Sequence, residues 1–92
     1  MKLLLFLTFQ GKALSPTGLV FQKTIDIGSN SLPCIGDDLT DTITKSGSLH
    51  VVAKNINYDD DECVVTLESV EDDKHNEYQI CEMAKLHGWS KS

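Results

Sequence analysis

The chain has 92 residues, of which 40% are hydrophobic, 24% charged and 7% aromatic, and its formal net charge is −6. A chain of this length buries about 60–70% of its unfolded surface, which is enough for one core, so we expect a single domain over residues 1–92. All 8 basic residues are lysine. Without arginine or a basic cluster, direct nucleic-acid binding is not expected.

Two strands joined by a loop are predicted first. Residues 2–10 alternate between apolar positions and positions of mixed character, which is typical of a strand with one buried face. That face would carry Leu3, Leu5, Leu7 and Phe9. Residues 11–18 are bracketed by glycines and contain a proline, which indicates a loop. Residues 19–27 alternate again and predict a second strand, antiparallel to the first.

A short strand is predicted after a connection with two turn signals. Residues 28–31 are rich in glycine and serine, and Ile35-Gly36-Asp37 indicates a tight turn. We therefore expect a strand over residues 39–44, which ends at another turn in residues 45–48.

A β-hairpin is predicted next. Residues 49–58 and 62–70 are rich in β-branched and apolar side chains, and three aspartates, Asp59–Asp61, separate them. Like charges at such a tip repel one another, and water screens them. Alternation in the first of these strands predicts one face with Leu49, Val51 and Ala53 and another with Val52, Ile56 and Tyr58.

The last predicted element is a helix over residues 73–87. The hydrophobic period changes after the hairpin, and Asp72 or Asp73 is the predicted N-cap. Acidic residues in the first turn and basic residues in the last turn suit the helix dipole. Gly88 is predicted to end the helix, with Trp89 folding back.

These elements predict an α+β fold that is mainly β: a small antiparallel five-stranded sheet, or a partly open barrel, with one C-terminal helix. The pattern Pro33-x-x-Gly36-Asp37, followed by strands over 51–58 and 64–68 around an acidic turn, resembles small bacterial and phage proteins with SH3-like barrels. The resemblance covers about half of the chain. It implies a barrel-like fold, and it implies no activity and no site residue.

The acidic residues are concentrated in one segment. Residues 59–77 contain nine acidic residues and one lysine, so this segment carries a charge of −8 and the remainder +2. One interpretation is a solvated hairpin tip and helix start that keep a small protein soluble. The other is an anionic surface that meets a basic partner. Its predicted contact residues are Asp59, Asp60, Asp61, Glu62, Asp72 and Asp73.

No catalytic or metal-binding motif occurs in the sequence. The histidines, His50, His75 and His87, lack the i, i+4 spacing of a helical zinc site. No nucleophile elbow, glycine-rich phosphate loop or EF-hand spacing is present, and Cys34 has no local signature of a nucleophile. Neighbouring carboxylates at the hairpin tip point in alternating directions and do not converge on a cation. We therefore expect no enzyme activity, no cofactor and no bound metal.

The cysteine content and the N-terminal residues indicate the cellular compartment of the protein. Cys34, Cys63 and Cys81 are odd in number and widely spaced, which indicates free thiols in a reducing compartment. Cys63 and Cys81 are expected in the core. The apolar run over residues 3–9 is too short for a signal peptide or a transmembrane helix. We expect a cytoplasmic protein without membrane contact.

The sequence favours a non-enzymatic, acidic protein-binding domain. Its form would be a phage-type inhibitor that, as anti-CRISPR proteins do, blocks a basic nucleic-acid-binding surface of a larger complex. The partner would then be a protein with a basic surface. The alternative is a small structural or assembly subunit that self-associates through a strand edge or the helix face into a homo-oligomer. A third interpretation, a small enzyme or metal protein, predicts bound metal or a perturbed thiol.

Overall fold

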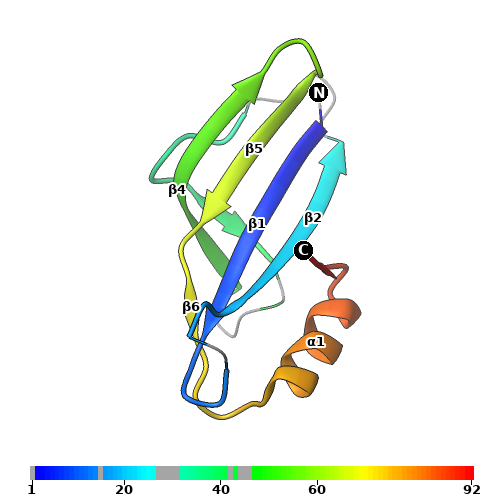
Figure 1. Cartoon of the computed structure of the whole chain (residues 1–92). Coiled ribbons are helices and arrows are strands. Elements are labelled where there is room, and N and C mark those ends of the chain that lie inside the picture. The colour runs from blue at the N-terminus through cyan, green and yellow to red at the C-terminus, as the bar shows by residue number, and fades with distance from the viewer. Residues whose placement is uncertain (1, 15, 27–31, 42, 44–46) are drawn as a thin grey trace.

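The computed structural model describes residues 2–14, 16–26, 32–41, 43 and 47–92 (Figure 1). In chain order the elements are β1 (Lys2–Gln10), β2 (Leu19–Asp26), β3 (Asp38–Thr40), β4 (Ser48–Asn57), β5 (Glu62–Leu67), β6 (Val70–Glu71), α1 (Glu77–Leu86) and β7 (Ser90–Lys91). The predicted fold class, α+β and mainly β with one C-terminal helix, is confirmed.

The strands form one mixed sheet in the order β3-β4-β5-β1-β2-β7, with β6 pairing with β1 beyond the end of β5 (Figure 1). The nearly continuous apolar run of β1 suits this central position. β1 is antiparallel to β2, as predicted, but parallel to β5, so that Leu4 lies between Thr24 and Val64. The prediction of an entirely antiparallel sheet is wrong for this pair. Within the described residues the sheet is open, with β3 and β7 at its edges, and is not the barrel that the resemblance implied.

Two predicted strands are interrupted. β3 ends at Thr40, because the Asp41 side chain accepts a hydrogen bond from the Ile43 amide at 2.9 Å and turns the backbone. The predicted strand over 62–70 divides into β5 and β6: the Glu68 amide donates to the His50 carbonyl of β4 at 2.8 Å, and the chain then pairs with β1. Positions 27, 42 and 44 of the predicted strands, 28–31 of the connection, and 45 and 46 of the turn lie outside the described residues.

A β-bulge in β4 changes its predicted faces. The register shifts between Val51 and Ala53, which leaves Val52 as an extra residue. Val51 is fully buried, Ala53 is exposed, and Ile56 packs against the core. The prediction that Ala53 shares the face of Val51, with Ile56 on the opposite face, is therefore wrong, because one extra residue reverses the alternation.

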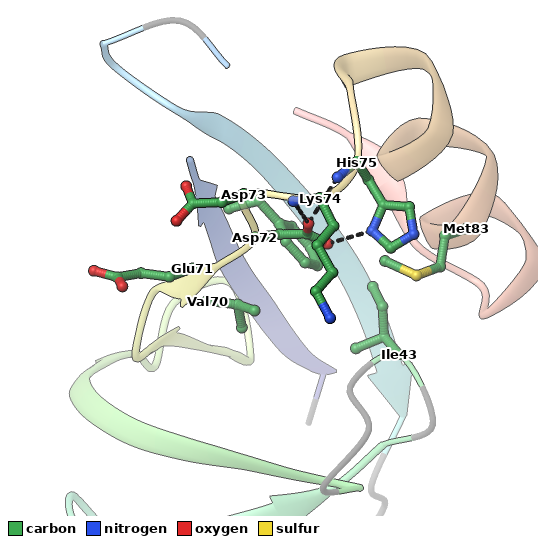
Figure 2. A pocket seen from close by; sticks show the side chains of 9 residues that line it. Ile43, Val70, Glu71, Asp72, Asp73, Lys74, His75 and Met83 are labelled. Carbon is green, nitrogen blue, oxygen red and sulfur yellow. Dashed lines mark hydrogen bonds and ion pairs between the residues drawn. The ribbon is translucent and has the colours of Figure 1, made fainter. Parts of the chain in front are cut away.

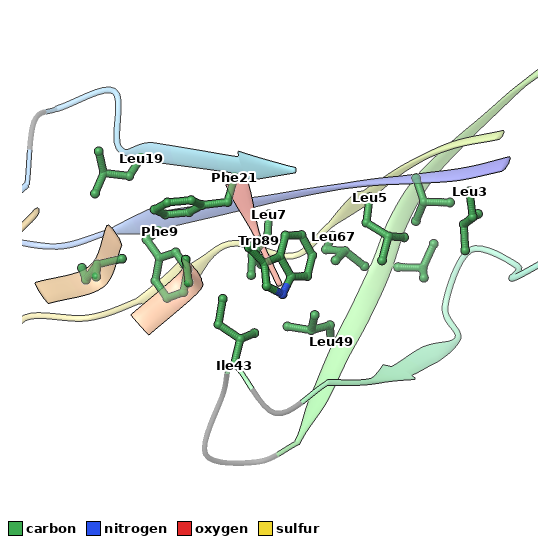
Figure 3. Close-up of a cluster of buried hydrophobic side chains, with 14 of the residues drawn as sticks. Leu3, Leu5, Leu7, Phe9, Leu19, Phe21, Ile43, Leu49, Leu67 and Trp89 are labelled. Carbon is green, nitrogen blue, oxygen red and sulfur yellow. The ribbon is translucent and has the colours of Figure 1, made fainter. Parts of the chain in front are cut away.

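The hydrophobic core lies between one face of the sheet and a cover formed by α1, Trp89 and Ile43 (Figure 3). The alternating burial of β1 confirms its predicted inner face. The rings of Phe9 and Phe21 pack edge to face, with centroids 5.6 Å apart. The buried side chains of the described residues are all apolar or cysteine: Leu3, Leu5, Leu7, Phe9, Leu19, Phe21, Ile43, Leu49, Val51, Cys63, Val65, Leu67, Ile80, Ala84 and Trp89.

The helix α1 begins later than predicted. Asn76 is its N-cap: Asn76 Oδ1 accepts from the Gln79 amide at 2.9 Å, and Gln79 Oε1 accepts from the Asn76 amide at 3.0 Å, which is a capping box. The prediction of Asp72 or Asp73 as the N-cap is wrong, because both side chains are engaged in the connection before the helix.

The end of α1 follows the prediction. Gly88 has a φ of 85°, and its amide donates to the Lys85 carbonyl at 3.2 Å. The Trp89 amide donates to the Ala84 carbonyl at 2.9 Å, which completes a Schellman motif. This turn folds Trp89 back into the core, where its indole Nε1 donates to Asp41 Oδ1 at 3.3 Å.

Candidate functional site

The hairpin tip, defined as Tyr58–Asp61, presents three acidic side chains to solvent. Asp59, Asp60 and Asp61 are exposed, and Glu62, the first residue of β5, is half-buried. Tyr58 is 79% exposed and lies beyond the end of β4. Tyrosine is enriched among the residues that contribute most to protein–protein binding. Sequence reasoning placed Tyr58 on a strand face and missed it as a contact residue; its position beside the turn is the signal that could have found it.

The backbone of the hairpin tip is held by Asn57. Its Oδ1 accepts hydrogen bonds from the amides of Asp59 at 3.2 Å and Asp60 at 3.4 Å, and its Nδ2 donates to Asp60 Oδ2 at 2.7 Å. Asp61 adopts a left-handed conformation with a φ of 52°, which aspartate and asparagine tolerate better than most residues. The three carboxylates are therefore presented from a defined turn.

The second group of predicted contact residues binds its own chain. Asp72 Oδ1 accepts from the amides of Lys74 and His75, both at 3.0 Å, and Asp72 Oδ2 lies 2.8 Å from His75 Nδ1. Asp73 Oδ1 accepts from the Lys12 amide at 2.9 Å and so ties the loop after β1 to the connection before α1. These contacts give Asp72 and Asp73 a structural role.

Asp72 and His75 form an oriented pair. Burial raises the pKa of Asp72, but the hydrogen bonds from the His75 side chain and amide and from the Lys74 amide more than offset it, so the pKa lies below its usual value. An ionised carboxylate only accepts hydrogen bonds, so His75 Nδ1 donates in this pair. His75 Nε2 is therefore an acceptor in the neutral ring and a donor in the imidazolium.

The two acidic groups lie at opposite ends of the sheet. Because β1 and β5 are parallel, Glu62 lies opposite Lys2 at the start of β1, whereas Glu71 lies opposite Gln10 at its end. A strand of this length spans about 26 Å, in a molecule 39 Å long. The structure therefore groups Glu62 with the hairpin tip and places Asp72 and Asp73 at the far end.

A pocket of about 440 Å³ lies beside Asp72 and His75 (Figure 2). Figure 2 shows the Lys74 side chain extending toward Ile43, whereas Glu71 and Asp73 point away on the other side. The apolar wall comes from four segments and consists of Phe9, Ile43, Val70 and Met83. Sequence reasoning missed this pocket, because only the fold brings these segments together.

The three histidines lie in separate places. His50 Nδ1 is 3.1 Å from Asp38 Oδ1 across β3 and β4, and the His87 carbonyl accepts from Lys23 Nζ at 3.0 Å. Among the residues that the structure describes, no three histidine, cysteine, aspartate or glutamate side chains are grouped so that they could hold a metal ion.

The three cysteines are free thiols. Cys34 is exposed, Cys63 is fully buried, and Cys81 is partly buried against the core. The predicted core positions of Cys63 and Cys81 are therefore confirmed. Burial raises the pKa of the Cys63 thiol, and the charge of Lys54 offsets this only in part.

In the described ranges, no helix has both the length and the apolar character that crossing a membrane requires. Comparisons with protein-family models, curated proteins and solved structures found no match.

Proposed function

We propose that the chain is a non-enzymatic protein-binding domain that docks through its hairpin tip on a basic surface of a larger complex. The observation that supports this proposal is the exposed Tyr58 beside three exposed aspartates on a turn held by Asn57. Tyrosine supplies rigid contact area, and the carboxylates supply a complementary potential. A turn that is ordered before binding also lowers the entropy cost of association.

The partner that we propose is a cytoplasmic, nucleic-acid-handling complex whose basic groove receives the hairpin tip. The chain would then act as a phage-type inhibitor, in the manner of anti-CRISPR proteins. The absence of arginine and of a basic cluster favours a protein partner over nucleic acid itself. The proposed contact surface is smaller than the six acidic residues expected from sequence, because Asp72 and Asp73 follow β6 at the other end of β1.

An affinity pull-down tests this proposal. Tagged protein is exposed to host lysate at low and at high salt, with and without added DNA or RNA, and the captured proteins are identified by mass spectrometry. We expect capture of a basic nucleic-acid-handling complex that is lost at high salt and competed by nucleic acid. Capture that is indifferent to salt and to nucleic acid contradicts the proposal.

Self-association is a second candidate function, and a different observation favours it. Tyr78 and Leu86 of α1 are 73% and 84% exposed, so the helix presents two large apolar side chains to solvent. The strand edges of the sheet consist of β3 and β7, which have three residues and two, and of the parts of β4 and β2 that these short strands leave uncovered. Sedimentation equilibrium of the wild type and of a Leu86→Glu variant tests this candidate: a salt-independent oligomer that the substitution dissociates would support it, and a monomer at all concentrations would exclude it.

A further inference from the structure

The pocket beside Asp72 and His75 has the size and the apolar lining of a small-molecule site. Its volume of about 440 Å³ lies within the usual range for such sites. Phe9 and Ile43 are core residues that form part of its wall, and Val70 and Met83 pack against the same core. An apolar ligand surface placed here would therefore continue the hydrophobic core.

The polar groups beside this wall include the Lys74 ammonium and the His75 ring. The Lys74 side chain extends over the pocket toward Ile43, and His75 lines the pocket beside Met83 (Figure 2). A lysine ammonium can only donate hydrogen bonds, and the His75 ring is oriented by its Nδ1 contact with Asp72. The Lys74 ammonium therefore favours a ligand that accepts hydrogen bonds and carries a negative charge.

Three acidic residues, Glu71, Asp72 and Asp73, also line the pocket. The Asp72 carboxylate is turned toward its own hydrogen-bond donors, the amides of Lys74 and His75 and the His75 ring. Glu71 and Asp73 point away from Ile43 and Met83 (Figure 2). Lys74 is the one basic residue in a segment with nine acidic residues, and it is the one whose side chain extends over the apolar wall.

We infer that this pocket binds a small monocarboxylate with an apolar body. The hydrocarbon packs on Phe9, Ile43 and Met83, and the carboxylate accepts a hydrogen bond from the Lys74 ammonium. The site lies at the opposite end of β1 from the hairpin tip, so it is independent of the proposed protein-binding function.

Titration of the amide NMR spectrum tests the inference with octanoate and with octylamine, which has the same tail and a positive charge, and with the shorter butanoate. We expect saturable shifts with octanoate at amides of the Val70–His75 segment and of Met83, with a Kd at or below about 1 mM. Octanoate should bind about tenfold more tightly than octylamine. Butanoate should bind more weakly than octanoate, because it buries less apolar surface.

Two matched lysine variants separate the site from a general charge effect. Lys74→Met keeps an apolar side chain without the ammonium, and we expect it to weaken octanoate binding by about tenfold. Lys85→Met, at an exposed position of α1 outside the pocket lining, should leave the affinity unchanged. Equal or tighter binding of octylamine, no effect of Lys74→Met, or no saturable shifts at these amides would each overturn the inference.

Discussion

The Lys23 ammonium lies 3.0 Å from the Asp41 carboxylate and joins β2 to the segment that follows β3. The same ammonium donates to the His87 carbonyl at 3.0 Å and lies 5.6 Å from the centroid of the Trp89 ring. Asp41 also accepts from the Ile43 amide and from the Trp89 indole. This pair therefore connects β2, Ile43 and the end of α1 over the core.

Removal of the Asp41 carboxylate should destabilise the fold. Its side chain is 9% exposed, and Asp41→Ala leaves three donors, on Lys23, Ile43 and Trp89, without this acceptor. We expect the free energy of unfolding to fall by about 2–3 kcal/mol, measured by urea unfolding with Trp89 fluorescence. Asp59→Ala, at the exposed hairpin tip, should change it by less than about 0.5 kcal/mol. Equal stability of the two variants would contradict the role of Asp41.

Stability should fall in acid because of Asp41 and Asp72. Burial raises the pKa of Asp41. Hydrogen bonds from the Ile43 amide, Lys23 and Trp89, together with the charge of Lys23, more than offset this effect, so the pKa of Asp41 lies below its usual value. The pKa of Asp72 is also lowered by hydrogen bonds that more than offset its burial. The unfolded chain then binds these protons at higher pH than the folded chain. The stabilisation is present above about pH 4 and is lost as the pH falls through the folded pKa.

The pH dependence can be assigned to one side chain. Urea unfolding at several pH values should show a shallower loss of stability in acid for Asp41→Asn than for the wild type, because the variant no longer takes up a proton at this position. The exposed variant Asp59→Asn should follow the wild type. If the curve of Asp41→Asn runs parallel to that of the wild type throughout the acid range, Asp41 does not carry the predicted proton linkage.

The cysteines should differ in reactivity with a thiol reagent such as DTNB. Cys34 is exposed and should react at once, whereas Cys63 is fully buried with a raised thiol pKa and should react only when the structure opens. We expect the rates at these two positions to differ by at least about a hundredfold, with Cys81 between them. Mass spectrometry assigns the modified residue, and Cys34→Ser should remove the fast phase. Labelling of Cys63 together with Cys34 would contradict the described core.

Much of the fold follows from local pattern. Alternation gives the bounds of β1 and its inner face, because the environment of each side chain depends only on the strand period. β4 does not follow this alternation, because the position of its extra residue, Val52, is determined by the pairing with β5. The start of the helix also does not follow from local pattern, because Asp72, Asp73 and Asn76 are all suitable N-caps. Asp72 contacts His75 and Asp73 accepts from the Lys12 amide, so Asn76 is the residue that caps the helix.

The candidate site was less predictable, because it depends on long-range pairing. Nothing local indicates that β1 and β5 are parallel, yet this pairing places Glu62 and Glu71 at opposite ends of β1 and divides the acidic segment. The pocket likewise needs Phe9 and Met83, which lie far apart in the sequence, to line one wall. The sequence did indicate the acidic hairpin, because its residues are contiguous.

The most direct measurement compares two variants with equal charge in binding to the partner captured from lysate. The tip variant carries D59N, D60N and D61N, and the control variant carries E68Q, E71Q and E82Q. Asparagine preserves the shape of the turn and tolerates the backbone of Asp61, so both variants should match the wild type in urea unfolding. We expect the tip variant to bind more than about tenfold more weakly, with a smaller salt dependence, and the control to bind like the wild type. Equal affinities of the two variants would contradict docking through the hairpin tip.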